Sequence, residues 1–204
     1  MTMRAIPQKH ASRLDRTYPL FTMNRVFAIF LTTVTMAFAT TLQGDDNPPT
    51  TVARVDLDRY SGLWYEIAKI PNRFQDQCVS DTTAEYALRE DGRIDVVNRC
   101  ITVAGDPDEA QGVARIVDAD TQARLEVSFV SLFGWYLFWG DYWVLGLAED
   151  YAYSVVGHPE RRYGWILSRT PTLDDEKLQH VRNLLSEQGY DPEDFEVTPQ
   201  SAAR

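Results

Sequence analysis

Cys78 and Cys100 are the only cysteines in the sequence of 204 residues, and their number limits the chemistry that they can do. An even number of cysteines in an exported chain favours a disulfide, and a pair of free buried thiols is the alternative. Two thiols cannot hold a zinc ion by themselves, and no C-x-x-C or H-x-x-x-H spacing adds further ligands. We therefore predict no metal site.

Histidine-based and nucleotide-based chemistry have little support in the sequence. Beyond the N-terminal segment only His158 and His180 occur, and neither belongs to the pattern of an activated nucleophile. The sequence contains no G-x-S-x-G motif, no phosphate-binding loop and no dinucleotide fingerprint. We therefore expect a protein that is not an enzyme and uses no cofactor, with an enzyme acting inside a pocket as the alternative.

The charge of the chain argues against a nucleic-acid partner. The formal net charge is -10, whereas a protein that binds nucleic acid presents a basic stripe to the phosphates. Aromatic residues are plentiful, with 5 Trp, 10 Tyr and 9 Phe. At this length we expect one well-buried domain.

The first 39 residues are typical of a signal peptide. A mild apolar run, residues 26–39, follows Met23-Asn24-Arg25. It is shorter than the ~20 apolar residues that a spanning helix needs. We expect cleavage after Ala39, with Met23 as an alternative start, and a disordered or amphipathic tail as the alternative reading. No cysteine precedes Cys78, so we expect no anchor on a lipid-modified N-terminal cysteine.

Beyond a predicted linker, residues 40–54, the chain reads as short strands followed by a helix. Eight β-rich runs are separated by turn residues: Leu63–Ile70, Thr82–Leu88, Ile94–Val103, Gly112–Val117, Arg124–Phe129, Tyr142–Leu147, Tyr151–Val156 and Tyr163–Ser168. Short strands at near-regular spacing predict an antiparallel sandwich or an up-and-down barrel.

An amphipathic helix should follow the last strand. Thr172 and Asp175 are spaced like a capping box, and Gly189 provides a stop. Between them lies one apolar stripe, made of Leu178, Val181, Leu184 and Leu185. We expect this stripe to lean on the outside of the barrel, and residues 195–197 to extend an edge. The predicted domain spans residues 55–198, with a tail at 199–204.

Three separated segments resemble the lipocalins, and specifically the bacterial lipocalin and apolipoprotein D branch. They are Gly62-Leu63-Trp64-Tyr65-Glu66-Ile67-Ala68, Asp150-Tyr151-Ala152-Tyr153-Ser154-Val155-Val156-Gly157, and Trp165-Ile166-Leu167-Ser168-Arg169-Thr170-Pro171. The resemblance implies an all-β fold, an eight-stranded antiparallel up-and-down barrel with a C-terminal α-helix packed on the outside. It also implies an opening at one end and a hydrophobic small molecule inside.

The same resemblance assigns structural roles to Gly62, Trp64 and Arg169. Successive strands alternate in direction, so Trp64 and Arg169 reach the same end, where the family pairs a Trp with an Arg across the closed base. Such a cation–π contact is worth ~0.5–2 kcal/mol. The opposite end is then the mouth.

Strand parity predicts which side chains line the interior. A three-residue turn at Glu90-Asp91-Gly92 pairs residues whose numbers sum to 182, and a two-residue turn at Glu149-Asp150 sets Trp143 opposite Val156. The predicted ligand-binding residues are Ala84, Tyr86, Val96, Asn98, Val127, Phe129, Trp143, Leu145, Ser154, Val156, Tyr163 and Trp165. This lining suits a fatty acid or a lysophospholipid, whose tail gains ~0.8 kcal/mol per buried CH₂.

Glu66 and the cysteine pair complicate this interior. Glu66 has the parity of an inward carboxylate, for which we expect a hydrogen-bond partner such as Tyr86 or water rather than a catalytic role. In the 182 register Cys100 faces Thr82, so a Cys78–Cys100 bond requires Cys78 to lie in a loop before the second strand. Related bacterial sequences resemble this arrangement.

The segment 130–140 is too apolar for an ordinary solvated loop. We expect it to act as a lid, a homodimer contact or a membrane-touching tip, since exposed apolar patches mark interaction sites. The alternative is a strand pair with one face in the core. The predicted lid residues are Phe133, Trp135, Tyr136, Phe138 and Trp139. With the signal peptide, the resemblance implies an exported protein that is periplasmic, associated with the outer membrane, or secreted.

Overall fold

The computed structural model describes residues 47–201. The predicted signal peptide at 1–39, with Met23 and the cleavage site after Ala39, lies outside these residues, as do 40–46 of the predicted linker and 202–204 of the predicted tail. None of the helices within 47–201 has the length and apolarity needed to cross a membrane.

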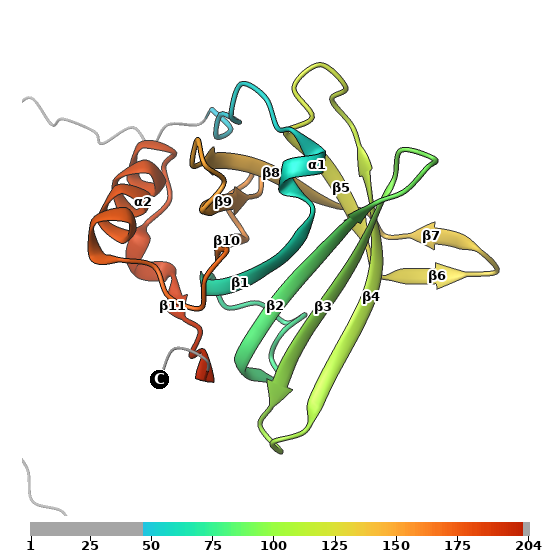
Figure 1. Cartoon of the computed structure of the whole chain (residues 1–204), viewed down its shortest axis with the longest axis horizontal. Helices are drawn as coiled ribbons and strands as arrows, with labels where there is room; N and C mark the ends of the chain where they lie inside the picture. The colour runs from blue at the N-terminus through green and yellow to red at the C-terminus, as the bar shows by residue number, and fades with distance from the viewer. Residues whose placement is uncertain (1–46, 202–204) are drawn as a thin grey trace, which may run out of the picture. The chain divides into compact units, whose positions relative to one another are not determined.

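Eight antiparallel strands close into a barrel, as predicted (Figure 1). They are β1 (Gly62–Lys69), β2 (Cys78–Leu88), β3 (Ile94–Thr102), β4 (Pro107–Ile116), β5 (Arg124–Ser128), β8 (Gly140–Leu147), β9 (Tyr153–Gly157) and β10 (Gly164–Ser168). Each strand pairs with its neighbour in this order, and β10 returns to pair with β1. A short strand β11 (Glu196–Val197) pairs with β1 as well.

Alternation along the strands divides the core into an inner and an outer cluster. Trp64, Ala84 and Val96 belong to the inner cluster, whereas Ile67 and Val155 belong to an outer cluster with the C-terminal helix. Successive side chains of a strand point to opposite faces. The barrel wall is therefore apolar on its inside and, beneath the helix, on its outside.

One end of the barrel is closed by a four-residue helix that the sequence analysis did not anticipate. Helix α1 (Leu57–Tyr60) begins after Asp56, whose carboxylate accepts from the N–H groups of Asp58 and Arg59. The indole of Trp64 donates to the carbonyl of Tyr60 at 2.8 Å and is fully buried. We call this closed end the floor.

Arg169 covers the floor from outside. Its guanidinium lies 3.8 Å from the ring centroid of Trp64 and donates to the carbonyls of Leu63, Arg59, Tyr60 and Ser61 at 2.7–3.0 Å. Gly62 has a φ of +94°, a conformation that favours glycine. The cation therefore ties α1 to the start of β1.

Helix α2 (Asp175–Glu187) lies on the outside of the barrel, beside β9 and β10 (Figure 1). Its N-cap is Asp174 rather than Thr172, because the Asp174 carboxylate accepts from the N–H of Lys177 at 2.9 Å. Val181 and Leu185 are fully buried. Gly146 on β8 makes room for the helix, since a Cβ there would lie 2.7 Å from Leu184.

The ends of the described chain pack on the barrel. In the predicted linker, the N–H of Val52 donates to the carbonyl of Val144 at 2.9 Å. At the other end, after a 3-10 turn η1 (Pro192–Asp194), the side chain of Gln200 donates to the carbonyls of Glu66 and Thr82 at 2.9 Å. Gln200 thereby bridges β1 and β2 where their own pairing has ended.

A small hairpin interrupts the barrel between β5 and β8. Strand β6 (Val130–Leu132) pairs with β7 (Trp135–Leu137) in a separate sheet. It points away from the barrel (Figure 1). The segment is thus a strand pair, but its faces are not in the core.

Candidate functional site

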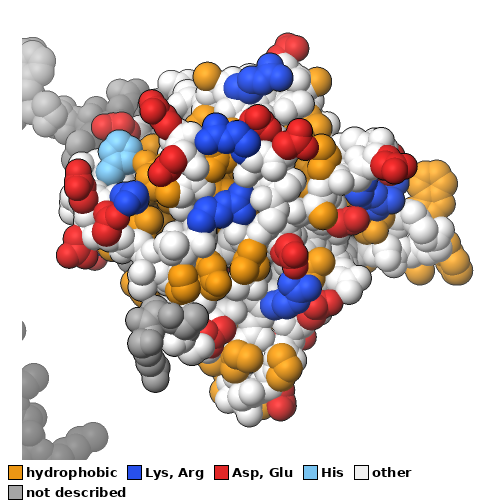
Figure 2. Space-filling model, in the orientation of Figure 1, with side chains coloured by type: hydrophobic (Ala, Val, Ile, Leu, Met, Phe, Trp, Pro, Cys, Tyr) orange, Lys and Arg blue, Asp and Glu red, His pale blue; other side chains and the backbone are white. Residues whose placement is uncertain are grey.

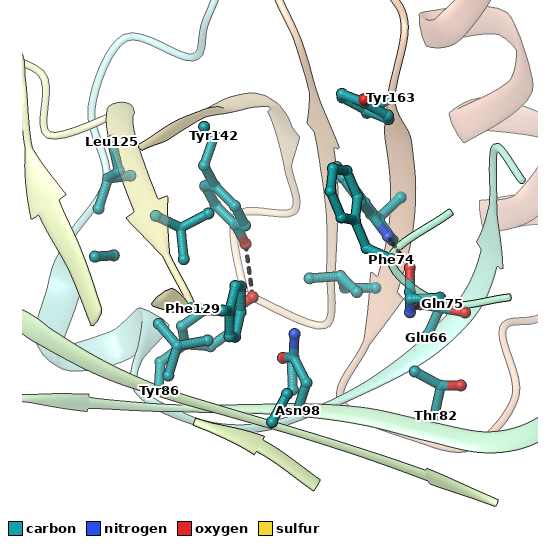
Figure 3. Close-up of a pocket in the computed structure, with 18 of the residues that line it drawn as sticks. Glu66, Phe74, Gln75, Thr82, Tyr86, Asn98, Leu125, Phe129, Tyr142 and Tyr163 are labelled. Atoms are coloured by element: carbon teal, nitrogen blue, oxygen red, sulfur yellow. Dashed lines mark hydrogen bonds between the residues drawn. The ribbon is translucent and has the colours of Figure 1, made fainter. Parts of the chain in front are cut away.

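The barrel encloses a cavity of about 580 Å³ that opens at the end opposite α1. This volume lies within the usual range of small-molecule sites, ~300–1,000 Å³. Of the predicted ligand-binding residues, those that line the cavity are Ala84, Tyr86, Val96, Asn98, Val127, Phe129, Tyr163 and Trp165. The surface of the cavity is mainly apolar, with polar side chains among its lining, and Figure 3 shows the aromatic rings of Tyr86, Phe129 and Tyr142 reaching into it.

The predicted ligand-binding residues on β8 were wrong. Trp143 and Leu145 belong to the outer cluster, while Tyr142 and Val144 line the cavity. The turn has four residues, since Ala148 N–H donates to the carbonyl of Tyr153, and a register shift follows between Val144 and Gly146. The longer turn moves the register by two residues and keeps the parity, whereas the bulge between Val144 and Gly146 reverses it and turns Tyr142 and Val144 inward.

On β9 the inward parity is as predicted, but the two residues lie behind the lining. Val156 packs in the inner cluster. Ser154 is fully buried and bonds to the hydroxyl of Tyr60 at 3.0 Å. Neither side chain contacts the open cavity.

Polar groups at the floor form a feature that the sequence analysis missed. The hydroxyl of Tyr142 lies 2.9 Å from that of Tyr60 and 3.0 Å from that of Tyr86. Burial raises the pKa of all three phenols, so they remain uncharged. Tyr60 lies in the unanticipated α1 and Tyr142 in the misassigned face of β8. Two features of the sequence could have predicted this cluster: Asp56 as the N-cap of a helix that contains Tyr60, and the alternation that places Tyr142 and Val144 on one face of their strand.

Glu66 lies inside the barrel and is almost fully buried, at 2% exposure. Its carboxylate accepts from Lys69 Nζ at 3.0 Å, Gln75 Nε2 at 2.8 Å and Thr198 Oγ1 at 2.6 Å. The predicted hydrogen bond between Glu66 and Tyr86 is wrong, because the Tyr86 hydroxyl bonds to Tyr142 instead. A bulge between Glu66 and Ala68 turns Lys69 inward beside Glu66. The charge of Glu66 is thus compensated by a neighbour on its own strand.

Gln75 connects the Glu66 carboxylate to residues nearer the mouth. Its side-chain oxygen accepts from the indole of Trp165 at 2.9 Å and from Asn72 at 3.1 Å. Figure 3 shows Gln75 and Glu66 together, away from the tyrosine cluster. The polar groups of the cavity therefore form two separate sets, one at the floor and one toward the mouth.

His158 lines the mouth and is 6% exposed. Its imidazole meets the ring of Tyr163 edge-on at 5.4 Å, and Nδ1 accepts from the N–H of Glu160. Burial, aided by the charge of Arg162, lowers the pKa of His158, against the opposing effects of Asp141 and Glu160. Among the described residues, no serine, threonine or cysteine side chain forms a hydrogen bond with this imidazole, as an activated nucleophile would.

Cys78 and Cys100 form a disulfide, as predicted. The expected placement of Cys78 in a loop is wrong, because β2 begins at Cys78. In an unbroken register Cys78 would lie four residues away from Cys100. Two register shifts, one on either side of Ser80, place Cys78 opposite Thr102 instead. The bond joins β2 and β3 at the rim of the mouth.

The predicted lid does not cover the mouth. Phe133 is 92% exposed and Trp135 is 76% exposed, at the tip of the β6–β7 hairpin. Tyr136 packs on Trp139, with ring centroids 6.1 Å apart. Of the predicted lid residues, only Phe138 and Trp139 line the cavity. Figure 2 shows hydrophobic side chains gathered at the hairpin tip.

Comparison with known proteins gives the same picture for the whole domain. The family model described as "Lipocalin-like domain" matches residues 55–200. The chain is 38% identical over 169 residues to "Outer membrane lipoprotein Blc" of Escherichia coli, covering 79% of this chain and 90% of that protein. It is 32% identical to "Apolipoprotein D" of Macaca fascicularis over 164 residues, covering 77% of this chain and 83% of that protein.

Among solved structures, insecticyanin from the tobacco hornworm Manduca sexta has a similar fold. The TM-score is 0.62 at 25% identity, and the match covers 76% of this chain and 86% of that one.

Proposed function

The chain belongs to the lipocalin family, and from that premise we propose that it binds and carries a lipid-like molecule, a fatty acid or a lysophospholipid, in its barrel. The family implies binding of a small hydrophobic ligand. The observation that carries the finer proposal is the apolar cavity of about 580 Å³ with a closed floor and an open mouth. An acyl tail gains ~0.8 kcal/mol for each CH₂ that it buries there.

The charged head of such a lipid would remain at the mouth. Arg162 lies there, and its partner Glu160 is exposed to solvent. Below the mouth, by contrast, Lys69 is already paired with Glu66. A desolvated carboxylate or phosphate without a partner is costly, so the head is more stable where water reaches it.

We also propose that the protein works outside the cytoplasm, in the envelope or secreted. The disulfide at the rim supports an oxidising compartment. A similar protein is named an outer membrane lipoprotein. The relatives are mostly binding proteins, and we propose that this chain is a carrier rather than an enzyme.

A matched pair of variants tests the carrier proposal. Ala110 lines the cavity, so Ala110→Trp should fill it and weaken binding of hexadecanoic acid at least about tenfold. The neighbouring Gln111 has the opposite parity and contacts Glu109 on the outer face, so Gln111→Trp should bind normally. Calorimetric titration of the delipidated protein measures both. Equal affinities for the two variants, or no binding by the wild-type protein, would refute the proposal.

A second function is favoured by the exposed hairpin. Leu132, Phe133 and Trp135 present a contiguous apolar tip to solvent, and such patches mark interaction sites. We propose that the tip docks on a membrane surface or on a second copy of the chain.

Replacing Phe133 and Trp135 together by serine should abolish sedimentation with phosphatidylcholine vesicles, or dimerisation in ultracentrifugation. The control is Val197→Ser, which removes an apolar side chain of 75% exposure from a different surface. If the double variant and the wild type behave alike in both measurements, the hairpin has no docking role.

A further inference from the structure

Four hydroxyl groups form a continuous hydrogen-bonded row at the floor of the cavity. Ser154 Oγ lies 3.0 Å from the Tyr60 hydroxyl, which lies 2.9 Å from that of Tyr142, and Tyr142 lies 3.0 Å from Tyr86. Ser154 also reaches the carbonyl of Gly146, at 3.4 Å. The row therefore has one end in the barrel wall and the other end at Tyr86.

The end at Tyr86 has unused hydrogen-bonding capacity. A hydroxyl can donate one hydrogen bond and accept two, and within residues 47–201 the Tyr86 hydroxyl has Tyr142 as its partner. If the hydrogens run from Tyr86 toward Gly146, Tyr86 offers lone pairs to the cavity. If they run the other way, Tyr86 offers its hydrogen. The row can thus present either an acceptor or a donor without breaking any of the bonds between its hydroxyls.

A second polar group lies close to this end. Asn98 lines the cavity one inward position nearer the mouth, because Val96 pairs with Tyr86 and Ala84 pairs with Asn98. Among the described residues, nothing forms a hydrogen bond with the Asn98 amide. Figure 3 shows this amide pointing into the cavity near Phe129. An amide and a phenol without full partners on a largely apolar wall are a recognition element for a polar atom.

The atom recognised here is uncharged. The phenols stay neutral, and Arg169 lies behind Trp64 with its N–H groups bonded to backbone carbonyls. Lys69 is paired with Glu66. Within residues 47–201, a carboxylate or phosphate would find no cation free to pair with it at the floor, whereas a hydroxyl or a carbonyl oxygen would find both a donor and an acceptor.

We propose that Tyr86 and Asn98 form a subsite for a neutral oxygen, a hydroxyl or a carbonyl, at the end of the ligand that enters first. This inference rests on the proposed function, since it assigns a chemical class to the ligand of the same cavity. The ligand is then polar at both ends, with a charged head at the mouth and an oxygen-bearing tail end at the floor.

The test compares acids that differ only at the tail end. Hexadecanoic acid and 16-hydroxyhexadecanoic acid, with the 12- and 14-carbon pairs, are titrated into the purified protein in a calorimeter. At the chain length that reaches the floor, the hydroxy acid should bind about fivefold more tightly, as one net hydrogen bond provides. The double variant Tyr86→Phe with Asn98→Leu should lose this preference and still bind the plain acid.

Tyr153→Phe is the matched control, because the Tyr153 side chain belongs to the outer cluster against α2. It should retain the preference. Equal affinity for the two acids at every chain length, or a preference that survives in the double variant, would overturn the subsite alone. If neither kind of acid bound, the proposed function would fail, and the subsite with it.

Discussion

Arg169 shows how one side chain can stabilise a fold without touching a ligand. Its guanidinium bonds to four carbonyls around α1 and covers the ring of Trp64. Hydrogen bonds from a charged donor are worth more than neutral ones, and carbonyls left without a donor add a desolvation cost. The residue therefore belongs to the stability of the floor and not to recognition in the cavity.

Arg169→Ala should lower the free energy of unfolding by about 2–3 kcal/mol, with little change in ligand affinity. Urea denaturation and calorimetric titration measure the two quantities. Arg124→Ala is the control, because the Arg124 guanidinium also lies over an indole, that of Trp143 at 4.5 Å, but on the exposed outside. It should cost less than about 1 kcal/mol. A large loss of affinity in Arg169→Ala would show that the floor is misassigned.

His158 should make stability depend on pH. Because burial lowers its pKa below the ~6.5 of unperturbed imidazole, the unfolded chain takes up a proton at higher pH than the folded chain. The contribution is fully present above about pH 7 and is lost as the pH falls through the folded-state pKa. In His158→Gln the free energy of unfolding should vary less between pH 7 and pH 5, as urea denaturation at several pH values measures. Identical slopes in both proteins would contradict this.

At the scale of elements, the turns decided the pairing of the strands, and a bulge decided the inward face of β8. The register of β2 and β3 follows from the Glu90-Asp91-Gly92 turn, and Tyr86 lies opposite Val96 as that turn requires. The turn before β9 has four residues, with Tyr151 at a φ of +64°. Non-glycine residues seldom adopt this conformation, so the sequence offered no sign of it.

The short helix α1 was hidden for another reason. Helix α1 has four residues, too few to show a periodic apolar pattern. Strand β9 is buried along its whole length, because the inner cluster packs on one side and α2 on the other. It therefore lacks the alternation of apolar and polar residues that usually indicates parity.

The disulfide between β2 and β3 should contribute to stability through the loop that it closes. The two cysteines are 22 residues apart, and closing a loop of this size stabilises the fold by about 3 kcal/mol. Cys78→Ser with Cys100→Ser should therefore unfold at lower urea concentration than the oxidised wild type. Dithiothreitol should bring the wild type to the stability of the variant and leave the variant unchanged. If dithiothreitol leaves the stability of the wild type unchanged as well, the bond contributes nothing.

At the scale of the whole molecule, the sequence predicted the architecture better than the cavity surface. The barrel and its outer helix follow from eight strand signals and three motifs that contain Trp64, Tyr151 and Arg169. The polar interior depends on contacts between distant segments, such as Thr198 with Glu66 and Tyr60 with Tyr142. Pairs of this kind leave no local pattern in the chain.

The closed floor has a kinetic consequence. Because α1, Trp64 and Arg169 seal one end, a ligand that fills the cavity must leave by the mouth through which its successor enters. Replacement then requires dissociation first, so the rate of exchange should not depend on the concentration of the incoming ligand. Stopped-flow displacement of a fluorescent fatty acid by hexadecanoic acid measures this rate. A rate that rose in proportion to the competitor would mean that two ligands occupy the barrel together, and that residence time is not set by escape alone.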